Sequence, residues 1–250
     1  MSSVARERRS RVLDALIERR QVLCSDLAQV LSVSEATIRR DLKSLADEGL
    51  VELIHGGARM PREVDHSFVA KSRRHGEAKA VIGRLAASLV KDDDLILLDS
   101  GSTSSAMVPH LGQRRGLRII LNSPRLAMEL KGQQLILLGG QYRPEFMDTV
   151  GPLAHTTLGE LRGYTAFIGA DGLDMEVGPS ASDIDSAHLH RLAVSNARES
   201  VLLVDHSKFA AAALFRIIDW ARIGTLVTDQ APQADWAAFL AGRGIRVLHP

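Results

Sequence analysis

Three short polar segments of the 250-residue chain carry side chains suited to holding a phosphorylated sugar. Residues 99–104 read Asp-Ser-Gly-Ser-Thr-Ser, and hydroxyls with backbone N–H groups at a helix start bind anions. Residues 169–174 read Gly-Ala-Asp-Gly-Leu-Asp and place two carboxylates, acceptors for sugar hydroxyls, on one turn. Residues 205–208 read Asp-His-Ser-Lys, whose lysine could pair with the same phosphate. We refer to the ten candidates together as the strand-end site: Asp99, Ser100, Gly101, Ser102, Thr103, Ser104, Asp171, Gly172, Asp174 and Lys208.

Each of these segments, taken alone, also has an ordinary structural explanation. A Ser/Gly turn before a helix is usually a cap, and aspartates in turns mostly accept hydrogen bonds from nearby backbone N–H groups. A lysine at the end of a strand is usually solvated. Their joint occurrence after three strands of one predicted sheet favours the binding site.

The elements that must position these residues alternate along the second part of the chain. Short, continuously apolar strands separated by helices are typical of a mostly parallel sheet covered on both faces. Ligands of such sheets bind beyond the carboxyl ends of the strands. We therefore expect one α/β domain over residues 77–250. The predicted strands are 95–98, 117–121, 135–138, 165–168, 200–204 and 225–228, and the predicted helices are 78–90, 102–111, 123–130, 153–161, 184–197 and 233–241.

A different pattern, typical of DNA recognition, occupies residues 34–49. Ser34 is a good N-cap and Gly49 a good terminator, so the spacing predicts a short helix between them. Its apolar positions Ile38, Leu42 and Leu45 share one face. The opposite face is small, hydroxylated and cationic, which suits the major groove of DNA. That face carries Ala36, Thr37, Arg40, Lys43 and Ser44, with Arg39 beside it.

The flanking segments complete a winged helix-turn-helix over residues 1–58. An apolar stripe over 12–17 predicts a first helix, Ser25 could cap a second over 26–31, and 50–57 read as a strand and ribbon tip. We assign Thr37, Arg40 and Lys43 to base edges and Arg39, His55 and the N-terminal arginines to phosphates. The full set of DNA-binding candidates is Ser34, Glu35, Ala36, Thr37, Arg39, Arg40, Lys43, His55, Gly56 and Gly57. Composition alone favours the alternative of a helical hairpin with a solvated basic face.

The order of residues, beyond their composition, resembles the DeoR family of bacterial transcriptional regulators. Residues 34–42 (Ser-Glu-Ala-Thr-Ile-Arg-Arg-Asp-Leu) and 55–58 (His-Gly-Gly-Ala) match its N-terminal signature. Residues 79–208 resemble its effector domain, with Leu-Asp-Ser-Gly-Ser-Thr at 98–103 and Phe-Ile-Gly-Ala-Asp-Gly at 167–172. The resemblance implies a homo-oligomeric regulator, by family default a repressor, of a carbohydrate-utilisation operon. Its implied partners are double-stranded operator DNA and a phosphorylated sugar.

That effector domain is related to ribose-5-phosphate isomerase, whose fold the resemblance implies for this chain. The isomerase continues its acidic turn with a lysine, a glycine run and a glutamate base, whereas residues 175–185 here lack the lysine and the glycine run. Enediol chemistry needs a positioned base and a charge stabiliser, so their loss predicts binding without turnover and no enzyme activity. Within the regulator family, Gly-Pro-Ser at 178–180 replaces the usual Gly-Leu-Thr, and His190 replaces a common lysine.

Two enzyme functions are the alternatives to a regulator. A sugar-phosphate isomerase with an accessory DNA-binding head is disfavoured by the changed base region. A nucleotide-binding oxidoreductase would need a Gly-x-Gly-x-x-Gly run after its first strand, and the sequence has none. No cofactor is therefore expected.

Composition sets broader bounds on the protein. The net charge is +1, with 15 Lys+Arg against 12 Asp+Glu in residues 1–79, an excess that permits a DNA-binding head without requiring one. No apolar run approaches the length of a membrane span, and the arginine-rich start has no signal-peptide core. A single cysteine, Cys24, excludes an internal disulfide and a thiolate metal site. We expect a cytoplasmic protein, with no metal and no membrane partner, in which residues 59–76 connect the two domains.

Overall fold

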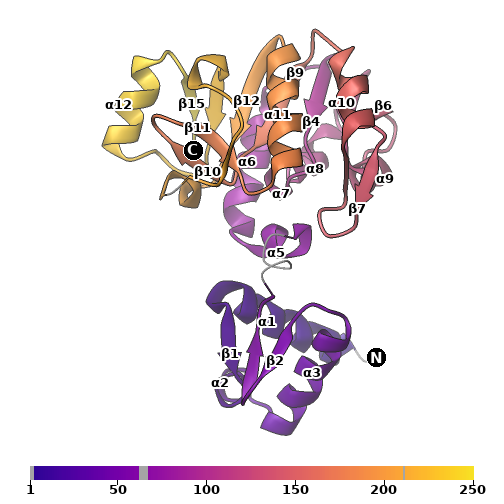
Figure 1. Cartoon of the computed structure of the whole chain (residues 1–250), viewed down its shortest axis with the longest axis vertical. Helices are drawn as coiled ribbons and strands as arrows, with labels where there is room; N and C mark the ends of the chain where they lie inside the picture. The colour runs from indigo at the N-terminus through magenta and orange to yellow at the C-terminus, as the bar shows by residue number, and fades with distance from the viewer. Residues whose placement is uncertain (1–2, 62–66, 211) are drawn as a thin grey trace. The chain divides into compact units, whose positions relative to one another are not determined.

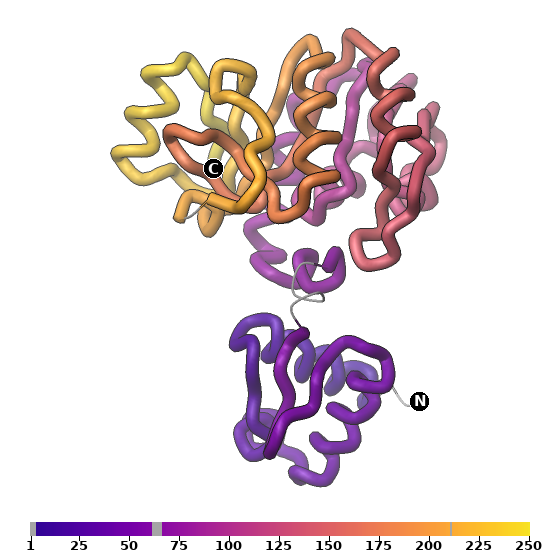
Figure 2. Tube along the Cα trace, viewed as in Figure 1, coloured from indigo at the N-terminus to yellow at the C-terminus, as the bar shows by residue number. Residues whose placement is uncertain are grey.

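Two compact units make up the chain, Met1–Arg74 and His75–Pro250. The structure, a computed structural model, describes residues 3–61, 67–210 and 212–250 (Figure 1; Figure 2 follows the chain as a tube). Part of the predicted connector, residues 62–66, lies outside the described residues. The rest of it contains the end of a strand, one short helix and the start of another.

The N-terminal unit is a winged helix-turn-helix. Its three strands form one antiparallel sheet in the order β1-β3-β2, with β2 and β3 as the hairpin of the wing. Apolar side chains of α1, α2 and α3 pack in one core with Ala58 of the wing. Its elements are α1 (Ser3–Arg19), β1 (Gln21–Leu23), α2 (Cys24–Leu31), α3 (Glu35–Asp47), β2 (Glu52–Ile54), β3 (Gly57–Arg59) and α5 (Phe68–Arg73).

The limits of α3 follow the capping residues in the sequence. The Ser34 side chain accepts a hydrogen bond from the Thr37 N–H, and Gly49 adopts a left-handed φ of +72° just beyond the helix. Both predictions are confirmed. The predicted cap of the second helix is wrong: α2 begins at Cys24, with Leu23 in the cap position, because the chain enters it directly from strand β1.

Helix α5 lies in the predicted connector and belongs to the N-terminal unit. Its last residue, Arg73, hydrogen-bonds to the Ser10 hydroxyl at 3.0 Å and pairs with Asp14 at 2.7 Å, both on α1. The Ser67 hydroxyl caps α5 by accepting from the Ala70 N–H. The chain crosses into the second unit between Arg74 and His75.

The C-terminal unit is built on a seven-stranded sheet in which every pair of neighbours is parallel, as the sequence predicts. The strand order is β15-β14-β12-β9-β4-β5-β6. Strands β4, β9 and β12, which precede the three polar segments, are therefore neighbours at its centre. The strands are β4 (Leu95–Leu98), β5 (Arg118–Leu121), β6 (Gln134–Leu137), β9 (Thr165–Gly169), β12 (Glu199–Leu203), β14 (Thr225–Val227) and β15 (Arg246–Leu248).

Successive side chains of the strands enter two different cores, one on each face of the sheet. Ile96 and Leu98 pack with residues of α6, α8 and α9, whereas Leu97 packs with residues of α10, α11 and α12. Figure 1 shows α10 and α11 covering the near face. The helices are α6 (Gly76–Ser88), α7 (Ser102–Ser105), α8 (Val108–Leu111), α9 (Pro124–Glu129), α10 (Pro152–Gly159), α11 (Ile184–Asn196) and α12 (Ala234–Gly242).

The unit departs from the sequence prediction in three ways. The edge strand β15 of the main sheet was not among the predicted strands. The predicted helix 102–111 is two short helices, because Pro109 in the first turn of α8 has no N–H to donate back to Ser105. Two small antiparallel sheets were not predicted. They are the hairpin β7 (Gln141–Arg143) and β8 (Asp148–Val150), and the sheet of β10 (Gly172–Asp174), β11 (Gly178–Ala181) and β13 (Phe215–Arg216). Within the described part of the chain, no helix is long and apolar enough to span a bilayer.

Candidate DNA-reading helix and strand-end site

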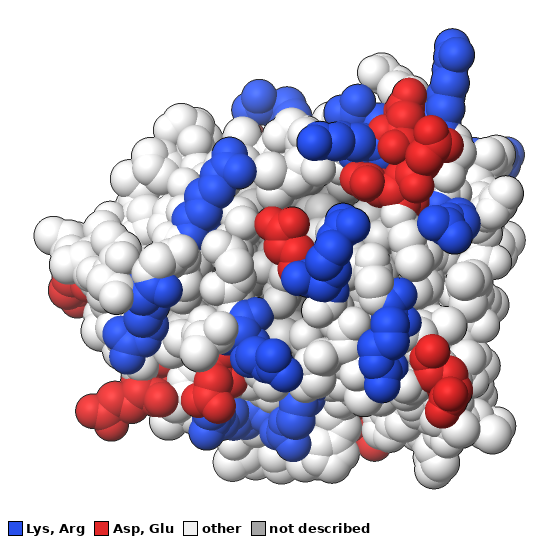
Figure 3. All heavy atoms as spheres, turned by 90° about the horizontal axis from the view of Figure 1, so that it is seen from above, with Lys and Arg blue, Asp and Glu red and all other residues white. Residues whose placement is uncertain are grey.

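Helix α3 presents the predicted face to solvent. Ile38, Leu42 and Leu45 are buried, while Arg39, Arg40 and Lys43 are exposed. The helix therefore buries one side and leaves the cationic side accessible. On the face drawn in Figure 3, Lys and Arg are scattered among Asp and Glu. The case for DNA contact comes from the exposed cations of α3.

The cations of α3 differ in what holds them. Arg39 pairs with Glu35 one turn earlier at 3.1 Å, on the exposed surface. Arg40 and Lys43 have no ion pair or side-chain hydrogen bond among the described residues. The Thr37 hydroxyl lies 2.9 Å from that of Ser34. Arg40 and Lys43 are consequently the side chains that could reach a base edge without first breaking an ion pair.

Two arginines at the start of α1 are bound within the unit, an arrangement that the sequence alone did not reveal. Arg8 contacts the buried carboxylate of Asp41 on α3 through two hydrogen bonds, of 2.6 and 3.1 Å, which raise the pKa of the guanidinium. Arg9 donates to the Ser44 hydroxyl at 2.6 Å and to Glu48 at 3.0 Å. Both side chains tie α1 to α3, so their first role is to hold the helix in place.

The two glycines of the wing have different structural roles. Gly56 is in the turn of the β2–β3 hairpin with φ +75°, next to the exposed His55. Gly57 is in β3, where an added Cβ would lie 2.0 Å from the carbonyl oxygen of Val22 on β1. Strand β3 can approach β1 only because this position has no side chain. Direct contact of the two glycines with DNA stays a prediction.

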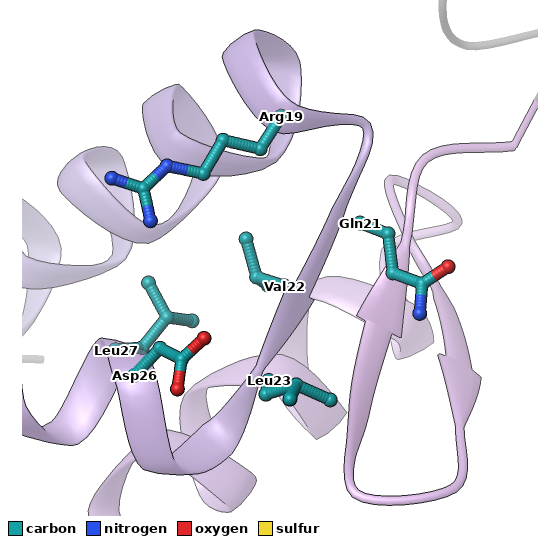
Figure 4. Close-up of a pocket in the computed structure, with 6 residues that line it drawn as sticks. All are labelled: Arg19, Gln21, Val22, Leu23, Asp26 and Leu27. Carbon is teal, nitrogen blue, oxygen red and sulfur yellow. The ribbon is translucent and has the colours of Figure 1, made fainter.

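A pocket of about 180 Å³ lies in the N-terminal unit beside β1 (Figure 4). Val22, Leu23 and Leu27 supply its apolar lining, and Arg19 and Asp26 bring one charge of each sign. None of its residues belongs to either predicted site.

In the C-terminal unit, the carboxylate of Asp99 at the end of β4 connects two of the three polar segments. Asp99 is buried, and its carboxylate accepts hydrogen bonds from the N–H of Gly101 at 3.1 Å and of Gly169 at 2.8 Å. His190 of α11 places Nε2 3.3 Å from the same carboxylate, and its Nδ1 is buried without a partner among the described residues. Asp99 therefore positions the Ser/Gly loop against β9.

The hydroxyls of residues 100–104 divide into bound and unbound groups. Ser100 donates to the buried carboxylate of Asp148 at 3.2 Å. Ser102 and Thr103 have no side-chain hydrogen bond among the described residues, and the hydroxyl of Ser104 is buried without a partner. The first turn of a helix also leaves backbone N–H groups unpaired. Residues 102–104 thus retain the donors that an anion needs.

Arg143, in the unpredicted β7–β8 hairpin, holds the carboxylate of Asp148 to which Ser100 of the segment 99–104 donates. It pairs with Asp148 at 2.8 Å and with Asp183, the N-cap of α11, at 2.7 Å. Burial lowers the pKa of Arg143, but the two carboxylates outweigh this effect and raise it above its ordinary value. Since its guanidinium nitrogens already bind Asp148, Asp183 and the Ser186 hydroxyl, Arg143 is a positioning residue.

The two predicted carboxylates of the acidic turn lie at opposite ends of a hairpin strand. Asp171 precedes β10 and accepts from the Ser182 N–H at 2.8 Å. Asp174 ends β10 and accepts from the N–H groups of Val177 and Glu176, which lower the pKa of its carboxyl. Asp174 thus holds a turn; its contact with a ligand stays a prediction.

The third polar segment follows β12. Asp205 is fully buried; one carboxylate oxygen accepts from the N–H and hydroxyl of Ser207, and the other has no partner among the described residues. Lys208 is half-buried in the turn that follows. Burial raises the pKa of Asp205, but the hydrogen bonds from Ser207 and the charges of Lys208 and His75 lower it below its ordinary value. A buried oxygen without a donor is a natural contact for a ligand hydroxyl.

Comparison with known proteins gives a consistent result. Residues 8–64 match the DeoR-like helix-turn-helix domain, and residues 74–230 match the DeoR C-terminal sensor domain. The HTH-type transcriptional regulator YgbI of Escherichia coli K12 is 32% identical over 89% of each chain. The HTH-type transcriptional repressor GlcR of Bacillus subtilis is 29% identical over 97% of this chain and 95% of its own.

A solved ribose 5-phosphate isomerase A from Methanocaldococcus jannaschii aligns over 53% of this chain and 54% of its own, at 24% identity and a TM-score of 0.40. The two family models match most of each unit, and the segments on which the resemblance depends (34–42, 55–58, 98–103 and 167–172) fall inside them. The resemblance seen in the sequence is therefore confirmed. The chain belongs to the DeoR family of transcriptional regulators.

Proposed function

We propose that this protein is a repressor that binds operator DNA through α3 and is released when the strand-end site binds a phosphorylated sugar. The observation that carries the proposal is the pair of unbound cations, Arg40 and Lys43, on the exposed face of a capped helix. They lie on the side opposite to Ile38 and Leu42, where a helix-turn-helix presents its recognition surface. The relative GlcR, named a repressor, supports the direction of control.

The effector class follows from the donors and acceptors at the carboxyl ends of β4, β9 and β12. Ser102 and Thr103 offer hydroxyls beside a helix start, and Lys208 offers a cation; these groups suit a phosphate. The unpartnered oxygen of Asp205 and the carboxylate of Asp171 suit sugar hydroxyls. A phosphorylated sugar satisfies both sets at once.

We infer binding without turnover, because residues 175–185 lack the lysine and the glycine run that accompany the glutamate base in the isomerase. Two winged units in a symmetric homo-oligomer would read a repeated or palindromic operator.

The test is binding of purified protein to labelled DNA from upstream of its own gene, measured against random DNA at matched salt. We expect the upstream DNA to bind at least a hundredfold more tightly. Addition of sugar phosphates should weaken that binding, and a thermal-shift screen should find a phosphorylated sugar that stabilises the protein by about 2.7 kcal/mol at a hundred times its Kd. Equal binding of both DNAs, or turnover of a sugar phosphate, would contradict the proposal.

A further inference from the structure

Helix α6 is the first element of the C-terminal unit, and its N-cap, His75, is the residue at which the chain enters that unit. His75 adopts a left-handed φ of +53°, a conformation that histidine adopts more readily than most residues other than glycine. Its side chain does not cap the helix but packs against the ring of His206.

The ring of His75 packs edge-on against the ring of His206, with centroids 5.1 Å apart and planes at 76°. His206 belongs to the polar segment after β12, between Asp205 and Lys208. It is held by Asp229, which accepts from the backbone N–H of His206 at 2.8 Å and lies 2.7 Å from its Nδ1. His75 thus rests on a fixed ring inside one segment of the strand-end site.

His75 and Lys208 both help to lower the pKa of the buried Asp205, against the effect of its burial. A ligand hydroxyl could bind the oxygen of Asp205 that has no partner among the described residues, and a phosphate could bind Lys208. Either contact would change the electrostatic field around Asp205 and the position of the segment that contains His206, against which His75 packs.

The same helix touches the Ser/Gly segment farther along. A Cβ added to Gly83 of α6 would lie 2.2 Å from the carbonyl oxygen of Ala106, directly after α7. The backbones of α6 and of the segment after residues 102–105 are thus in direct contact. Two of the three segments of the strand-end site therefore contact α6. The segment after β4 does so near Gly83, and the segment after β12 does so at the N-cap, His75.

From this arrangement we infer that α6, through the His75–His206 contact, transmits occupancy of the strand-end site to the chain that leads to the winged unit. The inference rests on the proposed function. A ligand that bridges residues 102–104 and Lys208 would act on both of the segments that contact α6. The first residue to respond is His75, which is bonded to Arg74, the last residue of the N-terminal unit.

The test separates coupling from binding. Labelled upstream DNA is titrated with the full chain, with and without ribose 5-phosphate, glucose 6-phosphate or glycerol 3-phosphate, and the probe that most weakens DNA binding to the wild type is kept. The coupling factor is the ratio of the two DNA Kd values, typically about 5 to 150 in allosteric proteins. Calorimetry gives the Kd of the probe for the DNA-free protein.

His75→Asn keeps a residue that tolerates left-handed φ and removes the ring. We expect its DNA Kd without the probe, and its probe Kd without DNA, to stay within about twofold of wild type, because each binary complex keeps its own contacts. The coupling factor should fall by about two- to tenfold, the worth of one ring–ring contact. His75→Gly, which also accepts this φ, should lose coupling to the same extent.

His110→Asn is the matched control, since His110 is exposed on α8 and has no ring contact or ion pair among the described residues. Its coupling factor should equal that of the wild type. A wild-type coupling factor in both His75 variants would overturn the inference while leaving the proposed function standing. A wild-type protein that does not respond to any of the probes would overturn both.

Discussion

The carboxylate of Asp99, at the end of β4, accepts a 2.8 Å hydrogen bond from the backbone N–H of Gly169, at the end of the neighbouring strand β9. Through its second oxygen it also receives the N–H of Gly101. One buried side chain thereby sets the spacing between the Ser/Gly loop and the acidic turn. The relative positions of these two segments of the strand-end site therefore depend on Asp99.

Asp99→Ala should destabilise the C-terminal unit. It leaves the partly buried N–H groups of Gly101 and Gly169 without an acceptor, at a cost of up to about 1–3 kcal/mol each. Both tryptophans, Trp220 and Trp236, are in this unit, so their fluorescence during denaturant unfolding reports on it alone. Asp99→Asn, which keeps an acceptor oxygen, should lose less; equal stability of the alanine variant and wild type would refute the role of Asp99.

Lys208→Met should weaken binding of a phosphorylated sugar by about 10- to 100-fold, the worth of a charge-assisted hydrogen bond. The same sugar without its phosphate should bind both proteins equally weakly. Calorimetry measures each Kd. Lys131→Met serves as the control, because Lys131 is exposed after α9, outside the strand-end site. A loss that is independent of the phosphate would remove Lys208 from the phosphate contact.

Replacement of Arg40 should change the specificity of DNA binding. We expect Arg40→Ala to lose about 1–3 kcal/mol on the operator and much less on random DNA. Arg11→Ala should instead weaken both DNAs alike and reduce the slope of log K against log salt by about one unit, since Arg11 is an exposed candidate for a phosphate contact. Anisotropy titrations at several salt concentrations distinguish the two patterns. A uniform loss for Arg40→Ala would move that residue to the phosphates.

Gly57→Ala should abolish operator binding by displacing the wing, because its Cβ would overlap the carbonyl oxygen of Val22. Gly56→Asn is the matched variant: nothing lies within 4 Å of that position, and asparagine tolerates its φ of +75°. We expect Gly56→Asn to fold normally, as judged by far-ultraviolet circular dichroism. Normal folding and operator binding by Gly57→Ala would show that β1 and β3 can separate without harm.

Acid should destabilise the C-terminal unit through Asp183 and Asp205. Burial raises the pKa of each carboxyl, but the partners outweigh it (Ser186 and Arg143 for Asp183, Ser207 and Lys208 for Asp205), so both pKa values are below normal. A depressed folded pKa contributes stability that is complete above the unfolded value of about 3.9 and is lost as pH falls through the folded value.

Tryptophan-monitored unfolding at a series of pH values measures this loss. Asp183→Asn removes one of the two groups, so its stability should fall less steeply with acid than that of the wild type. An identical slope in the two proteins would mean that Asp183 does not titrate differently in the folded and unfolded states.

Local signals made much of the fold predictable. Caps at Ser34 and Gly49 and the apolar spacing between them define α3 with no knowledge of the rest of the chain. The parallel sheet follows from apolar runs of four or five residues, and its central strands carry polar residues at their ends. Parallel pairing then places residues 99–104 and 205–208 together at the carboxyl ends of the central strands, although the two segments are about a hundred positions apart in the sequence.

Other features depend on contacts that no local pattern encodes. Strands β1, β7 and β10 have three residues each, too few for a period to be visible. Arg143 lies between two carboxylates, one of them 40 positions away, and only the folded hairpin joins them. Arg8 and Arg9 look like free cations in the sequence because their partners on α3 are more than 30 residues downstream.

The close approach of Gly57 to Val22 has one more consequence. Strand β1 lies between the first two helices, yet its hydrogen-bonding neighbour is β3, the returning strand of the wing. Through β1, the first helices of the N-terminal unit are therefore tied to a strand that lies more than 30 residues beyond β1 in the sequence. A fragment that stops before residue 57 leaves β1 with an open edge, and it should not behave as a smaller version of the head. Any minimal DNA-binding fragment must therefore retain the returning strand through Arg59, and shortening the wing should loosen α1 as well.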